Sequence, residues 1–477
     1  MKLSSLLKGV KTQDVYEERE VERVTDKDNE NLKNALFVCI DGNRCDGHSL
    51  AQKVIEKGAV AVVTNRDLGV SEQIIVEDTR CALSRIASNF YGNPTKKLKI
   101  IGVTGTNGKT STCFFVGNIL ESLGKKCGII GTVKNTWGDE SYDSVLTTPE
   151  PMELQKIFSE MVKSGCEYCV MEVSSQALSQ KRVHGIRFCA SALTNITPEH
   201  LDYHVNMENY INAKFELFNQ SDFACMNIDD EIIKENVYKT ECKTFTYSSV
   251  DDWADYTAKN VICNENGIRY EFVGMDCISR IESSLFGRFT VYNTLCAVSV
   301  LINLGFDIDE ISKAVKNVKP IKGRAEIVPI NKKFNVMIDY AHTPDGLQNI
   351  LSCVREITKG KVILVFGCGG DRDKSKRAEM GRIAGEMSDV AVVTSDNPRN
   401  ENPLLIINDI LCGMEKSKAR IAVKEKRRQA IEFALSKAKK GDLVLLAGKG
   451  HETYQIIGNE KIPFDERVII KEYFKEI

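Results

Sequence analysis

Two hydrophobic patterns alternate along most of the chain. Short runs rich in Val, Ile, Leu and Ala, typical of buried strands, are followed by longer segments in which apolar residues recur every three or four positions, typical of helices. Because strands and helices alternate, the pattern predicts an α/β protein with mainly parallel sheets. The predicted strands are residues 35–40, 60–64, 74–76, 98–103, 170–173, 192–195, 336–339, 362–366, 390–394 and 443–447, and the clearest helices are 49–57, 81–91 and 292–304.

Breaks in this pattern divide the chain into three predicted domains. Gly92-Asn93-Pro94 interrupts it once, and a third block begins around Pro320. A length of 477 residues suits three domains at roughly 150 residues each. We expect a smaller N-terminal α/β domain over residues 1–96, a central domain with a phosphate loop and a mainly parallel sheet over 97–319, and a Rossmann-like C-terminal domain over 320–477.

Composition excludes several classes of protein. With 42% hydrophobic residues the chain has enough apolar material for packed cores, and a net charge of -2 gives no electrostatic reason to expect nucleic acid as a partner. No apolar run approaches the roughly 18–20 residues that span a bilayer, and the N-terminus lacks a secretory signal. We therefore predict a cytoplasmic protein that neither binds nucleic acid nor inserts into a membrane.

The 16 cysteines are scattered along the chain. Without a secretory signal they are expected to be reduced thiols that pack as small hydrophobic residues. Cys166 and Cys169 form a Cys-x-x-Cys pair, but no second pair follows at zinc spacing, so a buried structural role is favoured over a metal site.

The strongest chemical motif is Gly105-Thr-Asn-Gly-Lys-Thr110, which follows a predicted strand and precedes a predicted helix. Glycines let backbone N–H groups approach phosphate oxygens, and the start of the helix adds a favourable dipole. Lys109 can reach the β- and γ-phosphates, and Thr110 can ligate magnesium. The longer general phosphate-loop pattern fails by one residue, because Val103 stands where its first glycine belongs. The motif predicts that the chain binds ATP and Mg²⁺.

Six stretches in this order resemble the Mur ligase family, the ATP-dependent amide-forming enzymes of peptidoglycan synthesis. They are Gly105–Thr110, Thr147-Thr148-Pro149, Glu172-Val-Ser-Ser, Asn195–His204, Asp339-Tyr-Ala-His-Thr-Pro344 and Asp396-Asn-Pro-Arg399. The resemblance is to members that add the third amino acid of the peptide. It implies a carboxylate activated by ATP as an acyl phosphate, which an amine then attacks. Such a site needs oxygen ligands for magnesium and cations around the phosphates. We expect a monomer that acts on small molecules.

The resemblance also implies roles for individual residues around ATP. The nucleotide-binding residues would be Gly105, Thr106, Asn107, Gly108, Lys109, Thr110, Thr112, Asn293 (adenine), Arg324 (phosphates) and Asp339 (ribose). The catalytic residues would be Lys109, Glu172, His200 and Lys214. Magnesium would be held by Thr110, Glu172, His200 and Lys214, the last as a carbamate.

Lys214 is the least obvious of these residues. Its apolar neighbours predict a partly buried helix face, where the pKa of a lysine falls. A neutral amine can add carbon dioxide and become a carbamate, as the matching lysine of the family does. Without the resemblance, an exposed lysine would be the default interpretation.

The resemblance places the acceptor substrate, UDP-N-acetylmuramoyl-L-alanyl-D-glutamate, against hydroxyl groups and one arginine. The matching residues are Thr147, Thr148, Ser174, Gln180 and Arg182. The first domain departs from the family, because Lys27-Asp28-Asn29 stands where Asp-Ser-Arg usually contacts the nucleotide. Asp46-Gly-His48 does fit the family pattern.

Asp396-Asn-Pro-Arg399 implies meso-diaminopimelate as the added amino acid. A planar guanidinium can hold the second carboxylate of diaminopimelate bidentately, whereas lysine would leave Arg399 unpaired. The other implied contacts are Arg372, Asp396, Asn397, Gly448 and Glu452, with Glu452 facing the distal ammonium.

Three alternatives remain open. A lysine-adding or relaxed Mur ligase would use the same chemistry, and only Arg399 and Arg372 argue against it. Folylpolyglutamate synthases share the phosphate loop and architecture, although they are not expected to carry Asp-Asn-Pro-Arg. A nucleotide-binding ATPase module without ligase turnover would lack the metal ligands that are present here.

Overall fold

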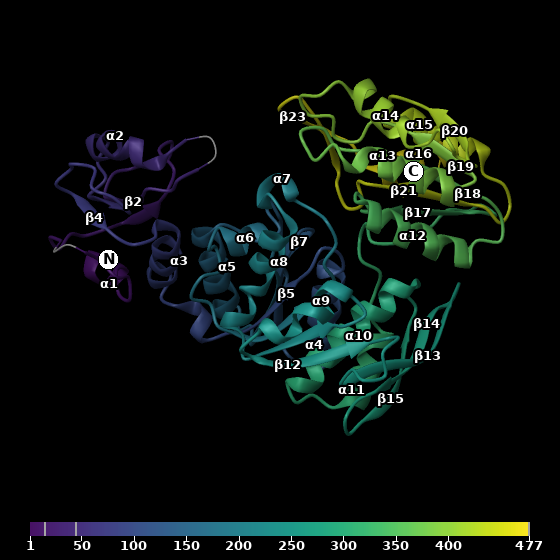
Figure 1. The fold of residues 1–477 in the computed structure, drawn as a ribbon. Coiled ribbons are helices and arrows are strands. Elements are labelled where there is room, and N and C mark those ends of the chain that lie inside the picture. The colour runs from purple at the N-terminus through teal and green to yellow at the C-terminus, as the bar shows by residue number, and fades with distance from the viewer. Residues whose placement is uncertain (14–15, 43–44, 476–477) are drawn as a thin grey trace.

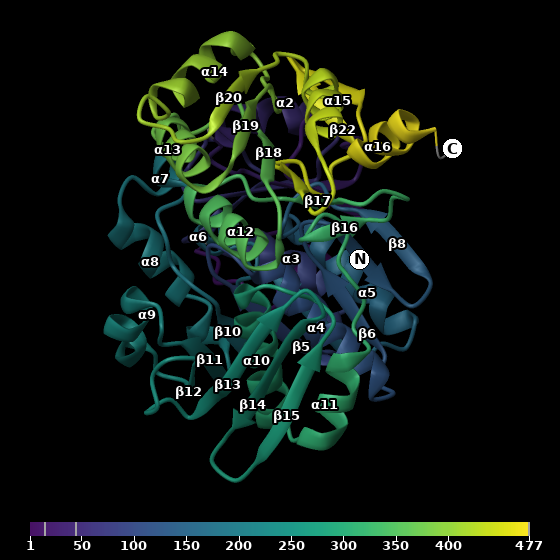
Figure 2. The ribbon, with the colours of Figure 1, turned by 90° about the vertical axis from the view of Figure 1, so that its right-hand side faces the viewer.

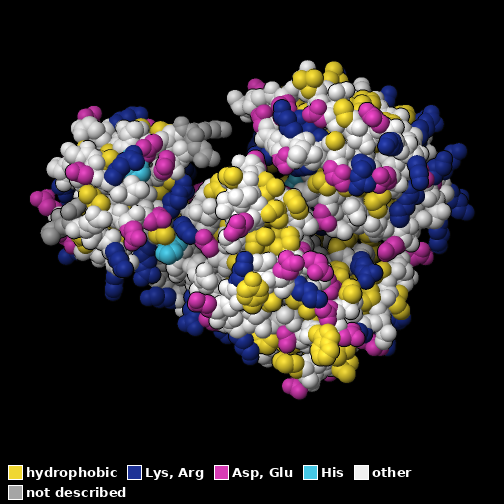
Figure 3. Space-filling view, in the orientation of Figure 1, with side chains coloured by type: hydrophobic (Ala, Val, Ile, Leu, Met, Phe, Trp, Pro, Cys, Tyr) yellow, Lys and Arg dark blue, Asp and Glu magenta, His cyan; other side chains and the backbone are white. Residues whose placement is uncertain are grey.

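The computed structural model describes residues 1–13, 16–42 and 45–475. Three α/β domains follow one another along the chain, each built on its own sheet (Figures 1 and 2). The N-terminal and C-terminal domains both border the central domain, and open space separates them from each other in the space-filling view (Figure 3). The predicted fold class is confirmed.

The N-terminal domain has a four-stranded parallel sheet in the order β1-β2-β3-β4. Its core joins side chains of β2 and β3 to the helices, and α3 also packs against α5 of the central domain (Figure 1). The elements are α1 (Leu3–Leu6), β1 (Arg23–Thr25), β2 (Ala35–Val38), α2 (Ala51–Glu56), β3 (Ala61–Thr64), β4 (Gln73–Ile75) and α3 (Thr79–Phe90).

The central domain has an 11-stranded sheet in the order β15-β14-β13-β12-β11-β10-β5-β9-β6-β7-β8. Its strands are β5 (Lys99–Thr104), β6 (Cys127–Ile130), β7 (Lys134–Trp137), β8 (Glu140–Asp143), β9 (Tyr168–Glu172), β10 (Phe188–Leu193), β11 (Phe223–Asn227), β12 (Lys243–Ser248), β13 (Tyr256–Asn264), β14 (Gly267–Val273) and β15 (Ile278–Ser283). Its helices are α4 (Lys109–Ser122), α5 (Pro151–Lys163), α6 (Ser175–Ser179), α7 (Leu201–His204), α8 (Met207–Phe215), α9 (Glu231–Asn236), α10 (Arg288–Asn303) and α11 (Ile308–Lys316).

Alternating side chains of the central strands explain why helices cover both faces. On β5, Ile101 and Val103 join a core with α4 and α10, whereas Ile100 points to the other core, with α5 and α8. Strands buried on both faces read as continuous apolar runs, which made them visible in the sequence.

The two edges of this sheet are antiparallel and were not predicted. β7 and β8 form one edge, and β14 and β15 form the other. These strands are only partly buried. From Ile268 onward, buried side chains alternate with more exposed ones along β14, because one face of the sheet meets solvent. Such mixed polar and apolar segments give a weaker signal than a buried strand.

The C-terminal domain has a six-stranded sheet in the order β16-β17-β21-β18-β19-β20, parallel except for β16, with helical cores on both faces. Its elements are β16 (Glu326–Val328), β17 (Asn335–Asp339), α12 (Pro344–Ile357), β18 (Val362–Phe366), α13 (Lys376–Met387), β19 (Val390–Val393), α14 (Pro403–Cys412), β20 (Arg420–Val423), α15 (Arg427–Lys437), β21 (Leu443–Ala447), β22 (Tyr454–Ile457), β23 (Glu460–Pro463) and α16 (Glu466–Phe474). Among the helices of the described residues, none combines the length and apolar character needed to cross a membrane.

Candidate active site

The phosphate loop is a turn between β5 and α4, where the sequence predicted it. Gly105 has a φ of 140°, and a Cβ there would lie 1.9 Å from the hydroxyl oxygen of Thr194, so the position requires glycine. The backbone N–H of Asn107 donates to Oδ1 of Asn195 at 2.8 Å, and the Thr194 hydroxyl donates to the Asn107 carbonyl at 2.6 Å. Thr194 and Asn195 directly follow β10, the neighbour of β5, so the loop is held at the carboxyl edge of the sheet.

Positive charge gathers at this loop. Lys109 is the first residue of α4, and its ammonium donates to the carbonyls of Gly105 and Thr106, each at 2.8 Å. The Thr106 hydroxyl lies 3.0 Å from the hydroxyl of Tyr210 and is buried. A helix start with an adjacent lysine suits an anionic phosphate.

Glu172 ends β9, on the other side of β5, and its side chain is buried. Its Oε1 accepts from the backbone N–H of Thr132 at 2.8 Å, and its Oε2 accepts from the Thr132 hydroxyl at 3.1 Å. A Cβ at Gly131 would lie 2.2 Å from Oε1, so the backbone packs closely against this carboxylate. The carboxylate is therefore held firmly at the edge that carries the phosphate loop.

His200 and Lys214 come from the segment after β10. The Nε2 atom of His200 lies 3.8 Å from Glu199, and burial lowers the pKa of this imidazole. Lys214 on α8 is 1% exposed, and its ammonium lies 4.5 Å from the centre of the Tyr210 ring. Burial, with the nearby charge of Lys109, holds the pKa of Lys214 well below its usual range, although Glu199 opposes the shift. The sequence predicted a partly buried lysine, and the structure buries it completely.

The chemistry of these side chains fits magnesium. Magnesium is commonly held by one or two carboxylates together with phosphate oxygens and water. Thr110 and Glu172 offer a hydroxyl and a carboxylate beside the phosphate loop, and His200 lies near Lys109 in the same region. Within the described ranges, no group of three or more His, Cys, Asp and Glu side chains could hold a metal by itself. A magnesium ion here would need oxygen ligands from its substrates.

A cavity of about 230 Å³ lies between α10 and the start of the C-terminal domain. Its lining includes Phe115, Phe286, Phe289, Ile321, Asn293 and Arg324. The buried Asn293 has its Oδ1 3.4 Å from the Thr112 hydroxyl, which fixes the amide at the cavity wall. An apolar slot with one oriented amide suits a flat heterocycle such as a purine.

Arg324 connects this cavity to the phosphate loop. Its guanidinium donates to the Thr110 hydroxyl at 3.0 Å and lies over the ring of Tyr340 at 4.6 Å. Asp339 ends β17 nearby and accepts the backbone N–H groups of Ala325 and Ala341, each at 2.7 Å. Burial raises the pKa of Asp339, and Arg324 opposes that shift. The structure thus brings the predicted nucleotide residues of both domains together.

The five residues predicted to hold the acceptor form one hydrogen-bonded group. The Thr148 hydroxyl donates to the Glu172 carbonyl at 2.9 Å and accepts the backbone N–H of Ser174 at 3.0 Å. Arg182 donates to the Thr148 carbonyl at 2.8 Å and to Oε1 of Gln180. Thr147 lies 3.0 Å from the Thr132 hydroxyl, which itself bonds Glu172. The group therefore adjoins the carboxylate beside the phosphate loop.

Three of the residues predicted to hold the amino acid lie on the loop after β19. Asp396 and Asn397 are buried, and Arg399 has a φ of 49° and donates to the Gly370 carbonyl at 2.7 Å. Burial lowers the pKa of Arg399, and the charge of Arg372 acts in the same direction. A Cβ at Gly369 would lie 2.9 Å from Nη1 of Arg399 and 3.9 Å from Cγ of Arg372, so both arginine side chains flank this glycine.

The opposite side of this loop is formed by the segment after β21. Gly448 has a φ of 110°, and a Cβ there would lie 2.8 Å from Oδ2 of Asp396. The Asn397 amide donates to Glu452 at 3.0 Å. Two chain segments 50 residues apart in sequence thus build one small polar pocket at the carboxyl edge of the C-terminal sheet.

In the first domain, Asp46 and His48 form a compact pair. The backbone N–H of His48 donates to Asp46 at 2.9 Å, its Nδ1 lies 2.6 Å from the same oxygen, and Arg66 pairs with the second oxygen. The pKa of Asp46 is lowered to about 2, chiefly by the backbone hydrogen bond from His48 and further by the side chains of His48 and Arg66. Asp28, at the position that departs from the family, pairs with Lys53 at 2.8 Å on the surface.

Sequence reasoning missed several residues that connect this site. Lys449, Glu199, Tyr210, Thr132 and Asp345 all lie against the predicted residues. Lys449 had a usable signal, because it stands between two glycines directly after a buried strand. The partners of the other four are remote in sequence, so only the fold shows them.

All 16 cysteines lie in the described part of the chain and are free thiols. Cys166 and Cys169 are both buried, and burial raises the pKa of each.

The fold and the site define a three-domain P-loop ligase that uses a nucleotide. Family models match residues 32–91 (Mur ligase family, catalytic domain), 103–301 (Mur ligase middle domain) and 323–450 (Mur ligase, glutamate ligase domain). The chain is 44% identical over 484 residues to the UDP-N-acetylmuramoyl-L-alanyl-D-glutamate--2,6-diaminopimelate ligase of Clostridium perfringens, covering 98% of this chain and 99% of the relative. It therefore belongs to the Mur ligase family, the ATP-dependent amide-forming ligases.

Solved structures agree with this assignment. A UDP-N-acetylmuramoyl-L-alanyl-D-glutamate--2,6-diaminopimelate ligase superimposes with a TM-score of 0.67 at 30% identity, covering 93% of this chain and 92% of that one. MurF of Thermotoga maritima, solved in complex with ADP, has a TM-score of 0.63 at 20% identity, covering 95% of this chain and 96% of that one. A folylpolyglutamate synthase of Mycobacterium tuberculosis shares the fold at 16% identity, with a TM-score of 0.63 over 78% of this chain and 92% of that one.

Proposed function

We propose that this protein joins meso-diaminopimelate to the D-glutamate carboxyl group of UDP-N-acetylmuramoyl-L-alanyl-D-glutamate at the expense of ATP. The observation that carries the proposal is the pocket after β19, where Arg399 and Arg372 flank Gly369 and Asn397 donates to Glu452. Paired guanidinium groups suit a second carboxylate, and the acids suit its ammonium. The relatives named for this reaction match along nearly the whole chain.

The phosphate loop and Arg324 would carry out the first half of the reaction. The terminal phosphoryl group of ATP passes to the D-glutamate carboxylate, so ADP leaves and an acyl phosphate forms. Lys109 and Arg324 reach this point from two domains and would neutralise charge that spreads over the phosphoryl oxygens. The amine of diaminopimelate then attacks the carbonyl carbon, and phosphate leaves as the amide forms.

Thr110, Glu172, His200 and a carbamate on Lys214 would hold magnesium, which would screen the phosphate charge. The support for the carbamate is burial, because a desolvated amine beside Lys109 is more stable uncharged and can add carbon dioxide with release of a proton. We expect a carbamate ¹³C signal in protein equilibrated with ¹³C-bicarbonate and its loss in Lys214→Met. The same signal in both proteins would refute the assignment to Lys214.

The three domains would divide the substrates among them. Residues 1–96 would hold the nucleotide end of the acceptor, residues 97–319 ATP, and residues 320–477 the incoming amino acid. All the site groups come from one chain, so we propose a monomer, to be checked by sedimentation. Its substrates place the reaction in the cytoplasm.

The direct test is phosphate release from ATP with the UDP-linked dipeptide, offered diaminopimelate or L-lysine in separate reactions. Turnover with diaminopimelate alone is expected. Arg399→Gln should lower kcat/KM for diaminopimelate by about 100-fold, since it removes one partner of a desolvated charge pair. Equal turnover with lysine would point to a relaxed ligase. ATP binding without turnover on either amino acid would overturn the proposed function.

A further inference from the structure

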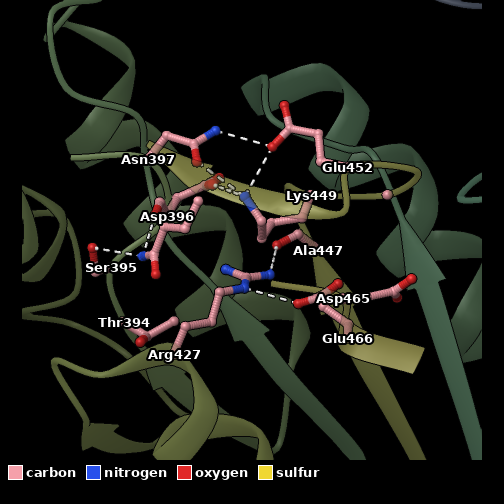
Figure 4. A network of polar contacts seen from close by, with 12 residues as sticks. Thr394, Ser395, Asp396, Asn397, Arg427, Ala447, Lys449, Glu452, Asp465 and Glu466 are labelled. Atoms are coloured by element: carbon pink, nitrogen blue, oxygen red, sulfur yellow. Dashed lines mark hydrogen bonds and ion pairs between the residues drawn. The ribbon is translucent and has the colours of Figure 1, made fainter. Parts of the chain in front are cut away.

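Lys449 lies at the centre of the polar network beneath the amino-acid pocket (Figure 4). It follows Gly448 at the end of β21, and its side chain is 0% exposed. The ammonium contacts Glu452 at 2.9 Å, Oδ1 of Asn397 at 3.0 Å and Asp396 at 3.4 Å. One buried lysine therefore contacts three of the side chains proposed to recognise the amino acid.

The partners of Lys449 are also fixed to one another. The Asn397 amide donates to the same Glu452 oxygen that Lys449 contacts, at 3.0 Å. The Oδ1 atom of Asn397 also accepts the backbone N–H of Ile456 on β22 at 3.0 Å. Figure 4 shows the Lys449 ammonium beside Asn397, Asp396 and Glu452, so it helps to orient Asn397 and Glu452.

A second pair lies below this network. Arg427 and Glu466 are both 0% exposed and contact each other at 2.8 Å, and Arg427 also donates to the Ala447 carbonyl at 2.8 Å. Arg427 and Glu466 pair with each other, and the charge of Arg427 also helps to lower the pKa of Asp396. Lys449 directly contacts Asp396 and Glu452, and because these groups are buried, loss of its ammonium would leave carboxylate charge without compensation.

The charge of Lys449 affects which incoming amino acid the pocket prefers. Diaminopimelate ends in an ammonium and a carboxylate, whereas lysine ends in an ammonium alone. Lys449 contacts Glu452 and Asp396 and partly neutralises them, so Arg399 and Arg372, which flank Gly369, can attract the carboxylate. Asp371, the other acid near Arg399, is exposed and accepts the amide of Asn400 at 2.8 Å. Without Lys449 the pocket would gain one negative charge, which favours a lone amine.

We propose that Lys449 is a positioning residue that sets the preference of this pocket for a zwitterionic side-chain end over a single amine. It orients Asn397 and Glu452 and compensates the carboxylates that would otherwise attract lysine. The inference rests on the proposed function, because it concerns the amino-acid pocket of that reaction. Lys449 is enclosed by protein and acts through the residues that it contacts.

The test compares Lys449→Gln with the wild-type enzyme and with Lys461→Met. Glutamine keeps a hydrogen-bond donor but removes the charge, and Lys461 is an exposed lysine on β23 that lies 4.5 Å from the Tyr454 ring. Steady-state kinetics with diaminopimelate, L-lysine and ATP give each KM and kcat, and ADP binding confirms that each variant is folded.

For Lys449→Gln we expect KM for diaminopimelate to rise on the order of tenfold, with KM for ATP unchanged. The ratio of kcat/KM for diaminopimelate over lysine should fall by at least about tenfold. Lys461→Met should match the wild type in every constant. An unchanged ratio in a folded Lys449→Gln protein, or an equal rise in KM for all substrates, would overturn the inference.

The double variant Lys449→Gln/Glu452→Gln tests whether the change in amino-acid preference comes from the net charge of the pocket or from local loss of structure. It removes one positive and one negative group, so the charge of the pocket is restored. We expect weak binding of diaminopimelate without a gain in lysine turnover, whereas the single variant gains lysine turnover. A double variant that uses lysine as well as the single variant does would refute the charge argument. Wild-type enzyme that is inactive with both amino acids would instead refute the proposed function.

Discussion

Several ionisable side chains are buried around the phosphate loop. Lys214 and His204 both contact the buried Tyr210 ring, and Glu199 lies near His200. Burial disfavours the charged form of each cation, so these groups are held neutral or close to a partner. Because these buried groups titrate differently in the unfolded chain, the free energy of unfolding should depend on pH.

His204 allows that sensitivity to be predicted. Its Nε2 lies 2.9 Å from the Ser175 hydroxyl, and burial lowers its pKa to about 4. Between pH 6.5 and 4 the unfolded chain binds a proton that the folded chain refuses, so stability falls as pH falls. We expect a loss of about 1 kcal/mol between pH 6.5 and 5.5 that His204→Gln removes.

Tryptophan fluorescence can isolate this effect during urea unfolding. The chain has two tryptophans, Trp137 and Trp253, and both lie in the central domain. His184 is an exposed histidine of the same domain whose pKa burial also lowers, so His184→Gln shows how much of the slope a surface imidazole contributes. Identical pH slopes for wild type and His204→Gln would show that His204 titrates normally in the folded protein.

At the scale of elements, α15 and α16 are joined through the buried Arg427–Glu466 pair. Arg427 begins α15, Glu466 begins α16, and neither side chain is exposed. Breaking a buried pair leaves one charge without compensation, whereas replacing both charges removes that penalty.

Arg427→Met should therefore destabilise the C-terminal domain by about 3–5 kcal/mol, and Arg427→Met/Glu466→Leu should recover most of that loss. Hydrogen exchange in peptides from α15 and α16 measures local opening without requiring two-state unfolding of three domains. Arg428→Met/Glu472→Leu, which removes an exposed pair on the same two helices, should change little. Equal exchange in Arg427→Met and wild type would contradict the prediction.

The elements also show how far sequence reasoning reaches. Strands buried on both faces, such as β5 and β18, were predicted because their apolar runs are continuous. The hairpins at the sheet edges were not predicted, because their solvent-facing residues interrupt the pattern. In the site, Glu172 and Arg399 were found through local motifs. Lys449 was missed although it stands between two glycines directly after β21, because its contacts with Asp396 and Asn397 join segments far apart in sequence.

At the scale of the whole molecule, the central and C-terminal domains meet over the phosphate loop. The Asn107 amide donates to Asp345 at 2.7 Å, Arg324 donates to Thr110, and His342 lies 3.6 Å from Glu199. His342, near the predicted ATP site but without a predicted role, thus belongs to this contact. The residues proposed to bind ATP come from both domains, so they are aligned only while the domains stay together.

Asp345 offers the cleanest test of that alignment, because it lies in the first turn of α12 and outside the predicted ATP residues. Asp345→Ala removes the acceptor for Asn107, at a cost of about 1 kcal/mol for one hydrogen bond. We expect KM for ATP to rise about fivefold, and the radius of gyration by small-angle scattering to increase without nucleotide. Asp345→Asn keeps an acceptor and should behave like the wild type. Equal radii of gyration and equal KM values for ATP in Asp345→Ala and Asp345→Asn would show that this contact does not hold the domains together. The hydrogen bond from Arg324 to Thr110 would then be the contact that keeps them closed.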